Sequence, residues 1–139
     1  MQWGLPMKEL KVEARMENLE KVLQFLDQEL EEMGCGIKAQ MQLDIAVEEI
    51  FVNIVHYAYA PGTGFATIRI EREDNRVSVT FMDSGVPYNP LEKADPDVTL
   101  SAEEREIGGL GIFMVKKSMD LMHYEYRNGM NILKLYKKM

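Results

Sequence analysis

A carboxylate, Glu49, and an amide, Asn53, stand four residues apart in the mostly apolar stretch 43–60. Wound as a helix of about 3.6 residues per turn, this stretch places Glu49, Asn53 and His56 on one stripe. Apolar residues border the stripe, and a helix that is apolar nearly all round is expected to be buried. A carboxylate held among apolar side chains is costly without a partner. Glu49 and Asn53 therefore need a neighbouring protein group, a water, or a ligand with its metal.

The chemistry open to this pair follows from its functional groups. The amide oxygen of Asn53 suits a hard cation such as Mg²⁺, which keeps waters and takes few protein ligands. The carboxylate of Glu49 could accept a proton from a hydroxyl group or a water. The same two side chains would also serve in an ordinary buried hydrogen-bond network. His56 is expected to be a structural residue, and neither it nor His123 has the spacing of a zinc ligand.

A second candidate lies where a predicted strand ends, at Asp83-Ser84-Gly85. A carboxylate at this place can accept a hydrogen bond from an exocyclic amine such as that of adenine. Gly85 would let a flat ring approach the backbone closely. The alternative is a plain turn, for which Asp and Gly are favoured residues.

A third candidate is the run Gly108-Gly109-Leu110-Gly111, which opens a predicted helix. Backbone N–H groups exposed by glycines, together with a helix N-terminus, attract phosphate. No Gly-Lys-Ser/Thr follows, so the run is not a Walker loop. It comes after a long loop, 86–102, and a tail of acidic residues. The glycines would act either as a flexible hinge or as part of a lid over phosphates.

Length and composition bound the class of protein. The 139 residues suffice for one domain with a core and are too few for two ordinary ones, so a single domain over 1–139 is expected. The formal net charge of −7 argues against a nucleic-acid backbone as the main partner. The lone cysteine, and the lack of a signal-peptide or membrane-spanning pattern, predict a cytoplasmic protein without a membrane partner. The eleven methionines are expected to fill core gaps, with a Met-lined interface as the alternative.

The elements that must position the three candidates follow from periodicity. Alternating apolar and polar residues predict strands, and apolar residues every three or four positions predict helices. The resulting order is strand, helix, helix, hairpin, loop, helix, hairpin. This order predicts an α+β sandwich with helices on one face of a largely antiparallel sheet. The predicted strands are 8–14, 65–72, 76–82, 124–127 and 131–137, and the predicted helices are 18–33, 43–60 and a segment from 112 through 121.

In this order, the three candidates resemble the motifs of the GHKL ATPase superfamily, which includes the ATPase domains of gyrase, histidine kinases and mismatch-repair MutL proteins. Glu49-x-x-x-Asn53 resembles its N box, Asp83-x-Gly85 its first glycine box and Gly109-x-Gly111 its second. Within the superfamily, the chain is similar to bacterial anti-sigma regulatory factors of the serine/threonine kinase type. That similarity covers nearly the whole chain and is carried by Asn53-x-x-His56-x-Ala58-Tyr59, Asp83-x-Gly85-x-Pro87-x-Asn89-Pro90 and Gly108-Gly109-Leu110-Gly111-Ile112.

The resemblance implies a two-layer α/β sandwich of the Bergerat type, with a mixed, mostly antiparallel sheet, that binds ATP and Mg²⁺. It implies that Glu49 is the general base and that Asn53 is a Mg²⁺ ligand in the nucleotide site. It implies that Asp83 binds the adenine amine, with Gly85 beneath the ring. The run Gly108-Gly109-Leu110-Gly111 would contact the phosphates, with its second and third glycines donating backbone N–H groups as the lid closes.

Two departures from the family pattern concern the adenine pocket. Pro87 replaces a glycine that is common in the superfamily, which would stiffen the base of the ring pocket. Gly129 is followed by Met130 and Asn131 where a threonine is common, which would remove one hydroxyl group near adenine.

The resemblance also implies a function and partners. It implies a protein serine/threonine kinase that phosphorylates an antagonist, an anti-anti-sigma protein, and sequesters a sigma factor. A different hypothesis is a nucleotide-gated protein-binding module with little or no kinase activity, and a third is a domain that keeps the fold without nucleotide. The acidic lid and the net charge of −7 suit a basic protein partner under either of the first two. Relatives of this type form homodimers, for which the first strand or helix 18–33 would supply the face.

Overall fold

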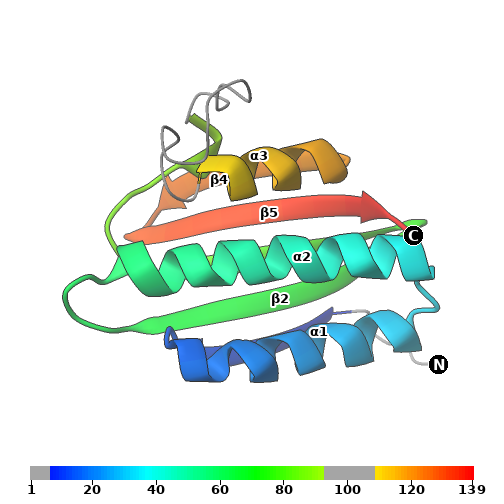
Figure 1. Ribbon diagram of the computed structural model, residues 1–139, viewed down its shortest axis with the longest axis horizontal. Coiled ribbons are helices and arrows are strands. Elements are labelled where there is room, and N and C mark those ends of the chain that lie inside the picture. Colours follow the sequence, from blue (N-terminus) through cyan, green and yellow to red (C-terminus); the bar gives the residue numbers. More distant parts are fainter. Residues whose placement is uncertain (1–6, 93–108) are drawn as a thin grey trace.

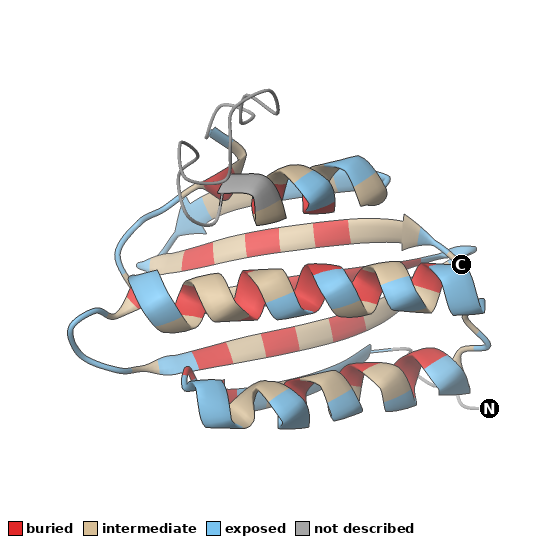
Figure 2. Cartoon of the chain, in the orientation of Figure 1, coloured by how far each residue is buried: buried red, intermediate tan, exposed pale blue. Residues whose placement is uncertain are grey.

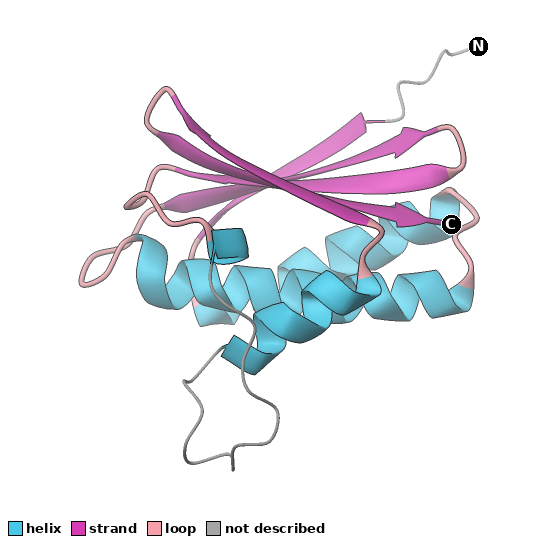
Figure 3. Ribbon diagram, turned by 90° about the horizontal axis from the view of Figure 1, so that it is seen from above, coloured by secondary structure: helices cyan, strands magenta, loops and turns pink. Residues whose placement is uncertain are grey.

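The computed structural model describes residues 7–92 and 109–139. Within these residues, five strands form one antiparallel sheet and three helices cover one of its faces (Figure 1). The view from above separates the two layers, with the helices all on the same side of the sheet (Figure 3). This arrangement confirms the predicted α+β sandwich. The strands are β1 (Met7–Glu13), β2 (Phe65–Glu73), β3 (Arg76–Asp83), β4 (Leu121–Arg127) and β5 (Met130–Lys138), and the helices are α1 (Leu19–Glu32), α2 (Ile37–Asn53) and α3 (Gly109–Ser118).

The strands lie in the order β1-β2-β3-β5-β4, so β1 is an edge strand, as the sequence predicts. β3 lies at the centre between β2 and β5. Its last residue, Asp83, pairs in register with Ala66 on one side and with Asn131 on the other. Because paired residues in neighbouring strands point to the same face of a sheet, this register brings the side chains of Asp83 and Asn131 together.

The core lies between the sheet and the helices. Bands of buried and less buried residues alternate along β2 and β5 (Figure 2), as expected for strands with one face against the helices. Each fully buried large apolar side chain contributes roughly 1.5–3 kcal/mol by its removal from water. The largest of these side chains belong to Phe51, Phe81, Leu26, Leu30, Leu43, Ile68, Ile70 and Leu135.

Helix α2 differs from its prediction at both ends. It begins at Ile37 and not at residue 43, and after Asn53 it continues as one π-helical turn, Ile54–Ala58. The wider turn changes the direction of the side chains that follow, and His56 is exposed with its ring edge-on to Tyr57. The α-helical spacing from which the stripe was predicted therefore does not extend to His56.

The expectation that this helix is buried nearly all round is wrong. Figure 1 shows α2 as the middle helix of the outer layer, with α1 and α3 on its two sides. Its inner face contacts the sheet, but none of the described elements covers its outer face. Ile45, on this outer face, is accordingly 63% exposed.

The last helix and the last hairpin meet earlier than the periodicity predicts. α3 ends at Ser118, and Leu121 already belongs to β4. Asp120 makes the junction, because its backbone N–H donates to the carbonyl of Tyr136 at 2.9 Å and its carboxylate accepts from the N–H of Lys138 at 2.6 Å. The predicted turn at Asn128-Gly129 is confirmed, with positive φ at both residues, as a tight hairpin requires.

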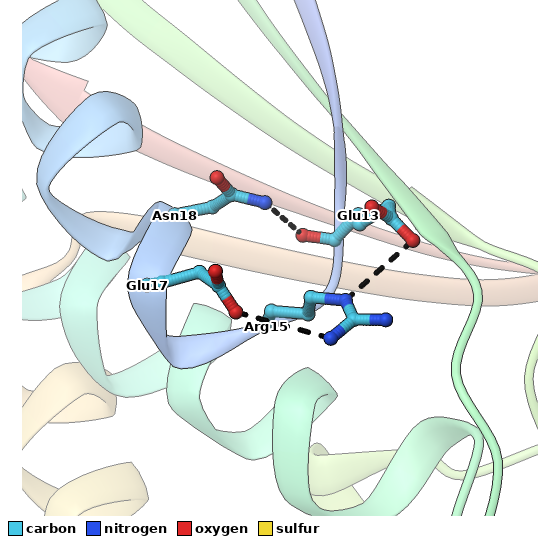
Figure 4. A network of polar contacts seen from close by, with 4 residues as sticks. All are labelled: Glu13, Arg15, Glu17 and Asn18. Atoms are coloured by element: carbon cyan, nitrogen blue, oxygen red, sulfur yellow. Dashed lines mark hydrogen bonds and ion pairs between the residues drawn. The ribbon is translucent and has the colours of Figure 1, made fainter.

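A small polar network fixes the corner between β1 and α1 (Figure 4). The side chain of Asn18 donates to the backbone carbonyl of Glu13 at 2.9 Å. Arg15 lies between two carboxylates, 3.5 Å from Glu13 and 3.9 Å from Glu17. Exposed ion pairs of this kind are each worth less than about 1 kcal/mol, so the backbone hydrogen bond is the main contact that sets the direction of the chain here.

Candidate functional site

A cleft opens between the carboxyl end of α2 and the ends of β3 and β5. Its volume is about 480 Å³, counted together with the open solvent at its mouth. Most of its walls are apolar, and a few polar side chains converge on it. Two of the predicted site residues, Asn53 and Asp83, line it together. The full lining is Ile50, Asn53, Ile54, Tyr57, Ala58, Phe81, Asp83, Val86, Tyr88, Pro90, Tyr124, Asn131 and Leu133.

Asp83 is a buried carboxylate held in a fixed orientation. Its Oδ1 accepts a hydrogen bond from the N–H of Gly85 and another from the Nδ2 group of Asn131, both at 2.9 Å. Only 6% of the residue is exposed. None of the described residues donates to the second oxygen, Oδ2. A buried acceptor with free capacity at the wall of an apolar cleft is suited to bind a donor group of a ligand.

Asn131 is a site residue that the three motifs do not include, and the sequence pattern indicates only the loss of a hydroxyl group there. Besides its bond to Asp83, its Nδ2 group donates to the carbonyl of Val86 at 2.9 Å. Its Oδ1 accepts from the N–H of Tyr88 at 3.1 Å and from the hydroxyl of Tyr124. One amide thus joins β3, β4 and the loop after Asp83. Its position two residues after the predicted Asn-Gly turn was the signal available, because that turn fixes the register of the hairpin.

Gly85 fits the site for a reason that differs from the one expected. A Cβ atom at this position would overlap the backbone carbonyl of Ala58, so only glycine allows the loop to pass the end of the π-helical turn. The N–H of the next residue, Val86, donates to that same carbonyl at 2.9 Å. The close approach is therefore to the protein's own backbone, and it sets the shape of the cleft wall.

Tyr59 links the segment after Asp83 to the start of β2 through its hydroxyl group. Its hydroxyl donates to the carbonyl of Phe65 at 2.5 Å and accepts from the N–H of Ser84 at 2.8 Å. Burial is the main cause that raises the pKa of Tyr59 above its ordinary value, so the hydroxyl keeps its proton and can donate.

Glu49 lies against the start of α3 and not in the cleft wall. A Cβ atom on Gly111 would overlap the carboxyl group of Glu49, so the third glycine of the run is the residue that allows this contact. Burial, and then the negative charge of Glu48, raise the pKa of Glu49 above its usual range. A raised pKa makes a carboxylate a stronger base. Asn53 lies one helical turn after Glu49 on the same side of α2, and it lines the cleft.

The glycine run begins a helix, as the sequence predicts. Gly109 and Leu110 are the first two residues of α3, and Gly111 is the third. Gly108 and the acidic residues after Glu92 lie outside the described residues. In residues 7–92 and 109–139, no group of three or more His, Cys, Asp or Glu side chains is arranged to hold a metal ion. A metal bound by Asn53 would therefore take its other ligands from waters or from a bound molecule.

The fold and this cleft define a class of ATPase domain. Residues 12–137 match the family described as the histidine kinase-like ATPase domain, and the chain belongs to this family. The resemblance to the GHKL superfamily that the three motifs carry is confirmed. By its description the family consists of ATPase domains, which agrees with the expected nucleotide.

Among curated proteins, the relatives are kinases by name. The chain is 29% identical to the serine/threonine-protein kinase BtrW of Bordetella bronchiseptica, over 70% of each chain. It is 26% identical to the serine-protein kinase RsbW of Bacillus mycoides, over 90% of this chain and 81% of that protein.

Solved structures agree on the fold. The RsbU and RsbW domains of Rv1364c from Mycobacterium tuberculosis superpose with a TM-score of 0.69 at 15% identity, covering 96% of this chain and 32% of that one. The histidine kinase AdeS of Acinetobacter baumannii gives a TM-score of 0.54 at 12% identity, covering 94% of this chain and 68% of that one. None of the described helices has the length and apolar character needed to cross a bilayer.

Proposed function

We propose that this chain binds ATP with Mg²⁺ in the cleft and transfers a phosphoryl group to a serine or threonine of a partner protein. The observation that carries the proposal is Asp83, a buried carboxylate at the wall of an apolar cleft with one oxygen held by two donors. Its other oxygen, Oδ2, would accept a hydrogen bond from the exocyclic amine of adenine. The match to an ATPase domain over residues 12–137 supports this ligand and supports a single domain of this kind over 1–139.

The remaining site residues, on α2 and α3, would bind the metal and the phosphates and accept the proton. Asn53 lines the cleft and would give its amide oxygen to Mg²⁺. The glycines at the start of α3 would give backbone N–H groups to phosphate, where the helix N-terminus favours negative charge. Glu49, whose pKa is raised by burial, would take the proton of the attacking hydroxyl. When bound, ATP and its Mg²⁺ supply the phosphoryl group and the neutralisation of its charge.

The regulatory role follows from the relatives. The chain is similar to proteins named serine-protein kinase and carries the motifs that resemble anti-sigma regulatory factors. The proposed partners are therefore a sigma factor, which the chain would sequester, and an anti-anti-sigma antagonist, which it would phosphorylate. The edge position of β1 supports this strand as one of the two faces proposed for a homodimer, because an edge strand leaves backbone groups unpaired.

A second candidate, a nucleotide-gated binding module with little or no kinase activity, is favoured by one observation. The carboxylate of Glu49 faces Gly111 of α3 and does not line the cleft. In this arrangement Glu49 would link the position of α3 to the state of the nucleotide without taking part in phosphoryl transfer.

Glu49→Gln separates the two candidates. Under the kinase proposal this variant binds Mg·ATP as the wild type does, in isothermal titration calorimetry, but loses phosphate transfer to the antagonist by about a hundredfold or more. Glu32→Gln, the same change at an exposed site on α1, is the matched control and should retain both. Transfer at the wild-type rate by Glu49→Gln would remove Glu49 as the base.

Asp83→Asn tests the nucleotide site itself. An amide in place of the carboxylate presents a donor beside the adenine amine, and we expect the affinity for Mg·ATP to fall by about tenfold or more. If neither the wild type nor this variant gives heat with Mg·ATP, the fold is present without the nucleotide function.

A further inference from the structure

The outer face of α2 carries a row of exposed apolar side chains. Ile37, Met41 and Ile45 recur every four residues and are 77%, 60% and 63% exposed. Residues at this spacing lie one above another on the same side of a helix. Single exposed apolar residues are normal on protein surfaces, but a contiguous row marks a surface that binds something.

Helix α3 extends this row. The two helices run side by side in opposite directions, as the colours of Figure 1 show. Gly111 of α3 contacts Glu49 of α2, so the next turn of α3 lies beside the preceding turn of α2. Those two turns carry Met114, which is 54% exposed, and Ile45. We define Ile37, Met41, Ile45 and Met114 as the apolar patch.

Four carboxylates border the apolar patch toward α1, and we define them as the acidic rim: Asp27, Glu31, Asp44 and Glu48. The first two belong to α1 and are held by Gln40 of α2, whose Nε2 group donates to Asp27 at 3.1 Å and to Glu31 at 3.5 Å. Within the part of the chain that the structure describes, no Lys, Arg or His forms an ion pair with any of the four.

Among the ion pairs of the described residues, none offsets the charge of the acidic rim. Oδ1 of Asp44 is buried, and no described group donates a hydrogen bond to it. Burial first, then a hydrogen bond with Asp27 and the negative charges of Asp27, Glu31 and Glu48, raise the pKa of Asp44 to about 7. A basic group brought to this rim from outside would relieve a repulsion that the folded chain leaves in place.

The opposite border of the apolar patch has another character. Lys38 of α2 and Lys117 of α3 are exposed on the side toward α3, where Lys117 lies over the ring of Phe113. The patch is thus acidic along one border and basic along the other. A partner that covers the apolar patch must match this charge asymmetry. The asymmetry therefore favours one orientation of a specific partner over non-specific hydrophobic binding.

We propose that the apolar patch and the acidic rim bind an amphipathic helix of another protein, with its apolar face on the patch and its basic residues along the rim. Ile37 to Ile45 span roughly 12 Å, which is the rise of about two turns of such a helix. A second copy of this chain, with its net charge of −7, and an anionic membrane would both be repelled by the rim. The patch residues do not line the nucleotide cleft, so the proposal stands apart from the proposed function.

Two synthetic helical peptides of about 18 residues test the proposal. Both carry the same apolar face, and one has Arg and Lys along one edge where the other has Glu. The readout is the ¹³C-methyl NMR signals of methionine in the intact protein. We expect the basic peptide to shift the signals of Met41 and Met114 saturably and to leave that of Met16, an exposed methionine outside the patch, unmoved. The acidic peptide should shift none of them.

Variants make the test specific. Ile45→Ser removes apolar area from an exposed position and should weaken binding of the basic peptide by about tenfold. Asp44→Asn with Glu48→Gln should weaken it by about threefold, and Met16→Ser should leave it unchanged. The proposal is overturned if both peptides bind equally, if neither shifts Met41 or Met114, or if those signals shift with protein concentration alone, which would make the occupant a second copy.

Discussion

Asn131 shows how a single side chain can define a pocket that motif comparison does not explain. Its amide donates to Asp83 and Val86 and accepts from Tyr88 and Tyr124. The hydroxyl group that the sequence analysis counted as lost is replaced by a group with more hydrogen-bonding capacity. Because Asn131 is itself buried, every one of these bonds forms where an unpaired polar atom would be costly.

Removing this amide should therefore affect both folding and binding. Asn131→Ala leaves the buried Asp83 with one donor fewer and removes the donor to the carbonyl of Val86, so we expect the free energy of unfolding to fall by about 2–3 kcal/mol. The affinity for Mg·ATP should fall by about tenfold, because the carboxylate of Asp83 loses its fixed orientation. Urea denaturation and calorimetry measure the two effects.

Asn131→Thr is the informative control. Its hydroxyl can donate to Asp83 but cannot reach all four partners, so both losses should be intermediate. Wild-type affinity in Asn131→Ala would show that Asp83 needs no support from β5.

The contact between Gly111 and Glu49 allows a prediction in which stability changes little but the pKa of Glu49 falls. Gly111→Ala adds a Cβ where the carboxyl group of Glu49 lies. This group ends a flexible side chain and can move away, so the free energy of unfolding should change by less than about 1 kcal/mol, aided by the better helix propensity of alanine. Glu49 would move toward water, and its raised pKa should fall back toward its ordinary value.

An NMR titration of the Glu49 carboxyl carbon measures this pKa directly, and phosphate transfer should be lost in the same variant while Mg·ATP still binds. Gly36→Ala, at a glycine with open space around it and no positive φ, is the matched control for a general effect of the substitution. An unchanged pKa in Gly111→Ala would mean that the start of α3 does not position Glu49.

At the scale of elements, α1 and α2 are packed through a polar contact as well as an apolar one. Leu26 and Leu30 of α1 and Leu43 and Val47 of α2 are fully buried in the same core. At the outer edge of this contact, Gln40 bonds Asp27, and burial first, then the neighbouring Asp27, raises the pKa of Asp44 to about 7. The two helices are thus joined by a group of carboxylates that ionise together only at a cost.

The stability of the fold should depend on pH through Asp44. Its folded pKa of about 7 lies above the ordinary value of 3.8, so the folded state holds this proton more tightly than the unfolded state does. The stabilisation is fully present below about pH 4 and is lost as the pH rises through about 7. Because the carboxyl is partly exposed, we expect about 1–2 kcal/mol after allowing for solvent screening.

Asp44→Asn is neutral at every pH and should remove this dependence. At pH 8 it should raise the free energy of unfolding by about 1–2 kcal/mol over the wild type, with little change at pH 4. Thermal denaturation between pH 4 and pH 8 gives the comparison, with Glu32→Gln, an exposed site on α1, as the control. A pH profile that is the same for Asp44→Asn and the wild type would contradict this assignment.

At the scale of the whole molecule, local patterns determined the order of elements. Period-two alternation in the strands and the Asn-Gly turn each depend on neighbours in sequence, and both predictions are confirmed. The positions of the three motifs at strand ends and helix starts follow from the same local signals. Asn53 and Asp83 line the cleft, and Gly111 reaches Glu49.

The features that local sequence patterns did not predict depend on contacts between residues distant in sequence. The π-helical turn after Asn53 and the close pass of Gly85 over Ala58 depend on each other across the fold. The exposure of Ile45 could not be predicted either, since an apolar helix face is expected to be buried and only the arrangement of α1 and α3 shows that it is uncovered. Asn131 was missed because its partners lie more than forty positions earlier, apart from Tyr124.

The pairing of Asp83 with Asn131 has a practical consequence for protein engineering. The exposed hairpin loop at Asn128-Gly129 looks like a convenient place to insert a tag or a fluorescent reporter. An insertion there that shifts β5 by one position would turn Asn131 to the other face of the sheet. A change in this loop would thus alter the proposed nucleotide site from outside the cleft.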